Sequence, residues 1–124
     1  MHFEKHRIVK ILFWVALVSS YLLAVLPQES VPELTPFNDK GNHFLAFSVL
    51  TLLLLHAYRV KYLTAFFLML LYGVLIEVSQ LFAVNRHGEL LDVLADTIGV
   101  VVGILLYWLI GKFYRSALYS DNDY

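Results

Sequence analysis

The chain has 124 residues, of which 60% are hydrophobic and only 15% are charged, and its mean hydropathy is +0.70. Soluble domains are typically about 45–50% apolar and about 25% charged, so this composition excludes an ordinary domain that folds in water. The formal net charge of −1 provides no basic surface for nucleic acid. The absence of cysteine excludes disulfides, thiolate metal ligands and cysteine nucleophiles. An integral membrane protein remains.

Four apolar segments follow one another along the chain, at residues 8–26, 43–58, 62–84 and 90–111. A spanning helix needs about 20 residues, and continuous apolar runs do not fit the alternating pattern of a barrel. We therefore predict an all-α membrane bundle of four helices, in which Asn42 or its neighbours extend the short second segment. Residues 1–7 then form a short N-terminal segment and residues 112–124 a polar tail, which we expect to be disordered from Tyr119.

The link between the second and third segments constrains the arrangement further. Only residues 59–61 separate the second and third segments, so these helices are predicted to form an antiparallel hairpin.

The first apolar run follows Lys5, Arg7 and Lys10 and thereby also resembles a secretory signal peptide. Because the run continues through Leu26, which gives it a full spanning length, we predict that this helix is retained.

The basic residues predict the orientation in the membrane. Lys40 and Arg86 lie near one set of helix ends, and seven basic residues lie near the other. These seven are Lys5, Arg7, Lys10, Arg59, Lys61, Lys112 and Arg115. Cytoplasmic loops carry an excess of Lys and Arg, so both termini are predicted to be cytoplasmic.

Ionisable side chains inside spanning segments are costly and usually face a protein interior or a wet cavity. Glu77 and Gln80 share a helical stripe with Gly73, and Asp92 shares a face with Asp96, because residues three, four and seven apart lie on one side of a helix. In the predicted topology these stripes meet the start of the second helix at the outer face. We predict an extracytoplasmic polar pocket there, formed by Asp39, Lys40, His43, Glu77, Gln80, Arg86, Asp92 and Asp96.

Simpler interpretations exist for parts of this pattern. The polar residues could form a structural network that holds a small bundle together, since helices in lipid lack a hydrophobic drive for association. Asp39 could equally cap the N-terminus of its helix. Gly99 and Gly103 form a small-xxx-small pair that allows close helix contact, either within the bundle or between protomers.

These residues follow a pattern that resembles the VanZ-like family of small membrane proteins, named for an accessory protein of glycopeptide-antibiotic resistance. The resemblance runs from Asp39 to Gly103, and at Asp96 the chain departs from the asparagine more familiar in that family. The matching motifs are Asp39-Lys40-x-x-His43-Phe44, Tyr72-Gly73-x-x-Ile76-Glu77-x-x-Gln80, Arg86 and Asp92-x-x-x-Asp96-Thr97-x-Gly99. The resemblance implies a multi-pass fold at the cell envelope and suggests a link to teicoplanin-type resistance, but it implies no settled biochemical activity.

Three functions are compatible with the predicted pocket. We favour a non-catalytic envelope protein that binds an amphiphile, such as a lipid headgroup or the acylated part of an antibiotic, with Lys40, His43 and Arg86 beside an anionic group. A membrane-embedded hydrolase or transferase would use Glu77 or His43 as general acid or base on a lipid-linked substrate. A small proton-coupled transporter would use Glu77 as its proton carrier.

The ligands and partners are predicted less sharply than the pocket. We expect membrane lipids, a lipid-linked or acylated small molecule and a second copy of the chain as candidate partners, and no nucleic acid. Ligand types for a divalent ion are present at His43, Glu77, Asp92 and Asp96, but their spacing matches no recognised metal motif. No cofactor and no metal site are therefore assigned from the sequence.

Overall fold

The computed structural model describes residues 2–26, 38–83 and 90–122, with side chains over residues 6–26, 41–83 and 90–114. The described residues form four helices and no strand: α1 (His2–Val25), α2 (Asn38–Tyr58), α3 (Tyr62–Leu81) and α4 (Leu90–Asn122). Each helix contains a stretch that is long and apolar enough to cross a membrane. The prediction of an all-α, four-helix membrane protein is confirmed.

The helices extend beyond the apolar segments at three ends. α1 begins at His2, α2 begins at Asn38, and α4 continues to Asn122. The expected disorder from Tyr119 is therefore wrong as far as Asn122. Helix formation is favoured by many polar residues, so a helix does not end where its lipid-facing stretch ends unless Pro, Gly or a cap stops it. α3, by contrast, ends at Leu81 rather than at residue 84.

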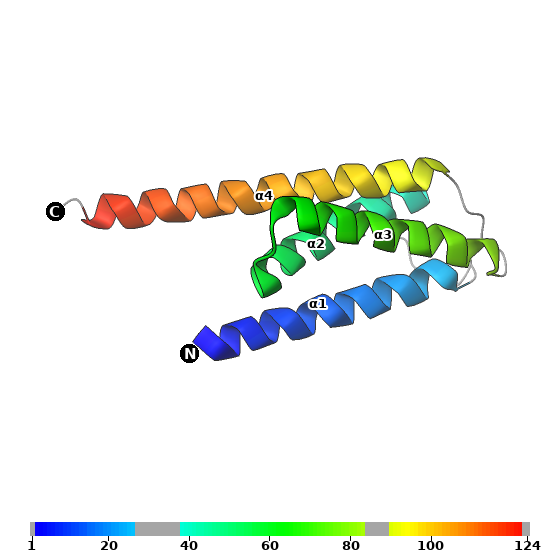
Figure 1. Ribbon diagram of the computed structural model, residues 1–124, viewed down its shortest axis with the longest axis horizontal. Coiled ribbons are helices and arrows are strands. Elements are labelled where there is room, and N and C mark those ends of the chain that lie inside the picture. Colours follow the sequence, from blue (N-terminus) through cyan, green and yellow to red (C-terminus); the bar gives the residue numbers. More distant parts are fainter. Residues whose placement is uncertain (1, 27–37, 84–89, 123–124) are drawn as a thin grey trace.

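The four helices alternate in direction, so the two chain ends lie at the same end of the bundle (Figure 1). α2 and α3 form the antiparallel hairpin expected from their three-residue link. Their connection contains Arg59 with a left-handed φ of 49°. The assignment of this end to the cytoplasm stays a prediction.

α2 makes its most extensive contact with α4, and two glycines of α4 allow it. A Cβ atom added at Gly99 would lie 2.6 Å from the backbone oxygen of Phe44, and one added at Gly103 would lie 2.7 Å from the backbone oxygen of Ser48. No side chain fits at such distances. The small-xxx-small pair therefore serves contact within the bundle, which decides between the two uses left open by the sequence.

Neutral hydrogen bonds join α1 to α3. The hydroxyl of Tyr72 lies 2.7 Å from that of Ser20 and donates to the carbonyl oxygen of Leu17 at 2.8 Å. The hydroxyls of Tyr21 and Ser79 are 2.7 Å apart. These bonds satisfy polar groups between apolar helices and hold the two helices in register.

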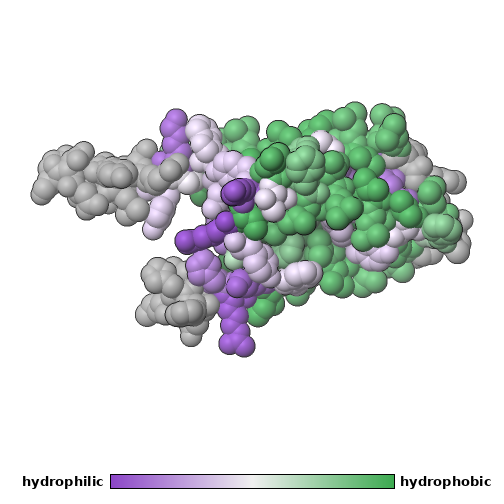
Figure 2. All heavy atoms as spheres, in the orientation of Figure 1, coloured by the Kyte–Doolittle hydropathy of each residue, from purple (hydrophilic) through white to green (hydrophobic). Residues whose placement is uncertain are grey.

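The outward surface of the bundle is apolar. Leucine, valine, isoleucine and phenylalanine side chains of all four helices are exposed, and Figure 2 shows a broad hydrophobic face with hydrophilic residues gathered toward the end where the chain begins and ends. The buried core is small and includes Phe47, Leu50, Leu55, Ile76 and Val100. An apolar exterior around a small core is what a lipid environment requires.

Candidate functional site

His43 of α2 and Asp96 of α4 form a buried hydrogen bond in which His43 Nδ1 lies 2.8 Å from Asp96 Oδ1. His43 is 7% exposed and Asp96 is 1% exposed. The close approach of the two helices at Gly99, one turn along from Asp96, brings these side chains together. An imidazole and a carboxylate are thus paired inside the apolar bundle.

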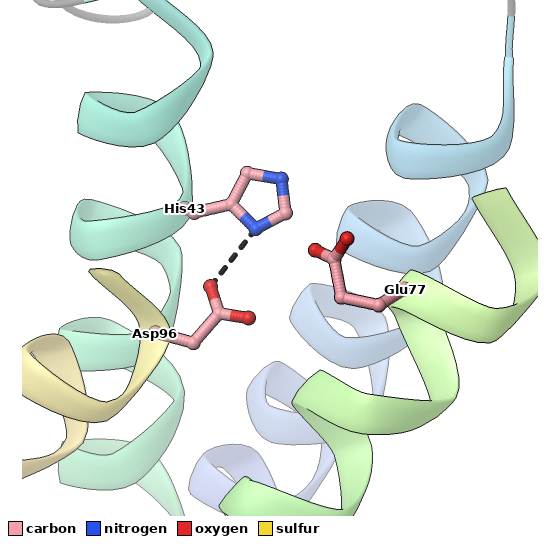
Figure 3. Close-up of side chains that lie close together, drawn as sticks. All are labelled: His43, Glu77 and Asp96. Atoms are coloured by element: carbon pink, nitrogen blue, oxygen red, sulfur yellow. Dashed lines mark hydrogen bonds and ion pairs between the residues drawn. The ribbon is translucent and has the colours of Figure 1, made fainter. Parts of the chain in front are cut away.

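Glu77 of α3 completes a cluster of three metal-ligating side chains. One ligand atom from each of His43, Glu77 and Asp96 lies within 4.8 Å of the others, and Glu77 is 9% exposed. In Figure 3 the carboxylate of Glu77, on α3, points toward the imidazole of His43 and toward Asp96. Gly73, one turn before Glu77, provides the room, because a Cβ atom there would lie 3.0 Å from Asp96 Oδ2. We call His43, Glu77 and Asp96 the polar triad.

Two other predicted pocket residues, Asp92 of α4 and Gln80 of α3, are also buried. Asp92, one turn before Asp96 on α4, is 2% exposed. Gln80 is fully buried, but its Nε2 donates to the carbonyl oxygen of Ala24 on α1 at 3.0 Å. The predicted shared stripe of Glu77 and Gln80 therefore reaches two different neighbours, and Gln80 contributes to the contact between α3 and α1.

The remaining predicted residues are not placed at side-chain level. Asp39 and Lys40 lie in the first turn of α2, but their side chains are outside the described set, so the capping interpretation of Asp39 stays untested. Arg86 lies in the segment between α3 and α4, outside the described residues. The structure thus brings His43, Glu77 and Asp96 together and leaves the three others as predictions.

The triad combines one imidazole with two carboxylates, which supply oxygen ligand atoms. Imidazole is both a general acid or base and a frequent metal ligand, and a paired carboxylate orients its ring. The arrangement can hold a proton, coordinate a cation or bind a polar headgroup. Ser48 of α2 has a simpler role, because its hydroxyl donates to the backbone oxygens of Phe44 and Gly99.

A cavity that the sequence did not predict lies at the opposite end of the bundle, near the two chain ends. Its volume is about 730 Å³. All four helices and the α2–α3 connection contribute to its lining, which contains three basic and four aromatic side chains: His6, His56, Arg59, Tyr62, Tyr107, Trp108 and Tyr114. No local motif marks it, because these residues are scattered through the sequence. His56 also bonds its own helix through Leu52, as expected of a structural histidine.

Four helices long and apolar enough to cross a membrane, three of which contribute to a buried His–Glu–Asp cluster, define a multi-pass α-helical membrane protein. The family model described as VanZ/LLP1 matches residues 6–111, which is most of the chain. The protein therefore belongs to the VanZ/LLP1 family, and the resemblance noted from the sequence motifs is confirmed. Searches of curated proteins and of solved structures found no match.

Proposed function

We propose that this VanZ/LLP1-family protein is a non-catalytic protein of the cell envelope that binds the polar end of an amphiphile at the polar triad. The observation that carries the proposal is the burial of three ionisable side chains from three helices at one place inside an apolar bundle. Such groups are costly in lipid and are retained where they serve a ligand, a proton or a pathway.

Neutral groups already supply the helix contacts that a purely structural network would have to provide. The α1–α3 contact uses the Tyr72–Ser20, Tyr21–Ser79 and Gln80–Ala24 bonds. The α2–α4 contact uses glycines and the bond from Ser48 to the Gly99 carbonyl. Neutral groups therefore join α1 to α3 and α2 to α4 without Glu77, which favours a binding role for the triad over a purely structural one.

The ligand class follows from the surroundings of the triad. The triad offers hydrogen-bonding and ionisable atoms, whereas the outer faces of α3 and α4 expose apolar side chains such as Leu75, Val78 and Leu94. A molecule with a polar head and an apolar tail satisfies both environments. A membrane lipid with its headgroup, or an acylated glycopeptide antibiotic such as teicoplanin, has this chemistry.

The test is native mass spectrometry of the full chain released from lipid nanodiscs. We expect the wild type to retain a lipid or lipid-linked adduct that is lost in Glu77→Gln and His43→Gln. His56→Gln is the matched control and should retain the adduct, because His56 lies at the opposite end of the bundle, beside the 730 Å³ cavity. Identical spectra for all four proteins, with circular dichroism showing intact helices, would refute binding at the triad.

A second candidate function, hydrolysis of a lipid-linked substrate, is favoured by the His43–Asp96 hydrogen bond. A carboxylate-oriented imidazole can remove a proton from water as the water attacks an ester or phosphoester, and can return that proton to the leaving group. Asp96→Asn should then abolish release of the leaving group from labelled lipid in proteoliposomes, with His56→Gln active. If the wild type releases nothing, the binding role alone remains.

A further inference from the structure

We propose that His43, Glu77 and Asp96 form a binding site for one divalent transition-metal ion, with Zn²⁺ or Mn²⁺ as the natural candidates. Sequence spacing assigned no metal here, because the three ligands come from three different helices and have no local motif. The site rests on the geometry of the triad. Only the additional step, in which the bound cation receives an anionic headgroup, rests on the proposed function.

The distances fit a metal ion after small side-chain adjustments. The ligand atoms lie within 4.8 Å of one another, so an ion placed centrally would be at most about 2.8 Å from each. Metal–nitrogen and metal–oxygen bonds to Zn²⁺ are about 2.0–2.2 Å, which requires each side chain to move by less than about 1 Å. Rotations about the side-chain torsions of Glu77 and Asp96 provide such movements without shifting a helix.

The ligand chemistry limits the kind of ion. One imidazole and two carboxylates suit Zn²⁺, Mn²⁺, Fe²⁺ or Co²⁺, whereas Ca²⁺ and Mg²⁺ prefer sets made only of oxygen. The chain has no cysteine, which removes the soft thiolate sites typical of Cu⁺. Three protein ligands leave a coordination position open for an exogenous group, as in many functional metal sites.

Burial makes a bound cation favourable in this place. Two carboxylates at this separation repel each other strongly when both are ionised in a medium of low dielectric constant. A divalent ion between them removes that repulsion and strengthens both contacts, because little water competes inside the bundle. The 2.8 Å contact between His43 Nδ1 and Asp96 Oδ1 already places a nitrogen and an oxygen ligand atom side by side, and an ion bound by both atoms would replace the proton that they share.

A cation at the triad would change which amphiphiles the protein can bind. Glu77 and Asp96 by themselves disfavour an anionic headgroup, but an ion with an open coordination position attracts a phosphate or carboxylate oxygen. The inference therefore specifies the proposed ligand as an amphiphile with an anionic headgroup. It also makes retention of that ligand dependent on the metal.

The experiment is a Co²⁺ titration of the tag-free full chain in nanodiscs, after metal removal with a chelator. Co²⁺ gives visible absorption bands when it enters a site with few ligands. We expect one Co²⁺ per chain, displaced by one equivalent of Zn²⁺, with affinity reduced about tenfold or more in His43→Gln, Glu77→Gln and Asp96→Asn. His56→Gln is the control for the other histidine-containing end and should change affinity less than twofold, within measurement error.

Three outcomes overturn the metal site: no stoichiometric Co²⁺ in the wild type, equal binding in the helical triad variants, or loss of binding only in His56→Gln. Mass spectrometry of the metal-free and metal-loaded wild type separates this inference from the proposed function. An adduct that persists without any metal binding refutes the metal site and leaves amphiphile binding intact. Bound Co²⁺ without any adduct supports the metal site and refutes amphiphile binding.

Discussion

The Nδ1 atom of His43 lies 2.8 Å from Oδ1 of Asp96, although 53 positions separate the two residues in the chain. This contact depends on a glycine. Gly99, three residues after Asp96, lets the α4 backbone approach α2 so closely that a Cβ atom would lie 2.6 Å from the Phe44 carbonyl oxygen. The packing of two helices and the assembly of the polar triad are therefore one structural feature.

Gly99→Ala should destabilise the bundle. Its added methyl group would meet the Phe44 backbone, and overpacking of this kind costs about 1–3 kcal/mol. The higher helix propensity of alanine returns at most about 1 kcal/mol. Gly111→Ala is the matched control, because a Cβ atom at Gly111 meets nothing within 4 Å. Thermal unfolding in detergent should show a lower midpoint for Gly99→Ala and an equal or higher one for Gly111→Ala. Equal shifts for both variants would contradict the close contact.

A double-mutant cycle should detect the His43–Asp96 bond. We expect His43→Ala and Asp96→Ala to be coupled by about 0.5–3 kcal/mol in the free energy of unfolding, because each removes the partner of the other. The comparison cycle, His56→Ala with Asp96→Ala, should be additive, since His56 bonds Leu52 on its own helix. Strict additivity in both cycles would show that the buried pair contributes nothing to stability.

Tyr72→Phe should loosen the contact between α1 and α3. The change removes the hydroxyl that meets Ser20 and Leu17, and a hydrogen bond between membrane helices contributes about 0.6–2 kcal/mol. Tyr114→Phe removes a hydroxyl from an exposed ring and serves as the control. The midpoint of thermal unfolding should fall for Tyr72→Phe alone. An unchanged midpoint would assign the contact to apolar packing.

The left-handed backbone at Arg59 should make this position sensitive to side-chain shape. A non-glycine residue in this conformation costs about 1–2 kcal/mol, which glycine avoids, and a β-branched residue fits least well. Arg59→Gly and Arg59→Val remove the same charge, so their difference isolates the backbone. We expect the glycine variant to unfold at the higher temperature. The reverse order would mean that the turn adopts another conformation in the membrane.

The predicted orientation can be tested with single cysteines, because the chain contains none of its own. A membrane-impermeant maleimide applied to intact cells should label Pro32→Cys directly. Lys61→Cys, in the α2–α3 connection at the end where both termini lie, should be labelled only after permeabilisation. Labelling with the opposite sidedness would place the polar triad near the cytoplasmic face.

Much of the fold could be predicted from the sequence because its causes are local. Hydropathy over about 20 residues marks a span, and the three-residue link at 59–61 forces a hairpin. Helix ends were predicted less well, since α4 continues to Asn122, beyond the end of its apolar segment at residue 111. The cavity lined by His6, Arg59 and Tyr107 could not be predicted, because residues from distant parts of the chain form it.

The sequence by itself determined the number of helices and their alternation, and it placed His43, Glu77 and Asp96 toward the same end of the bundle. Helical periodicity also placed Glu77 and Gln80 on one stripe. Only the tertiary structure decided that Glu77 joins His43 and Asp96, whereas Gln80 bonds Ala24 on α1. The reason is that periodicity defines the face of each helix, but the partner of that face depends on which backbones can approach, and this is set by glycines against atoms far away in the chain.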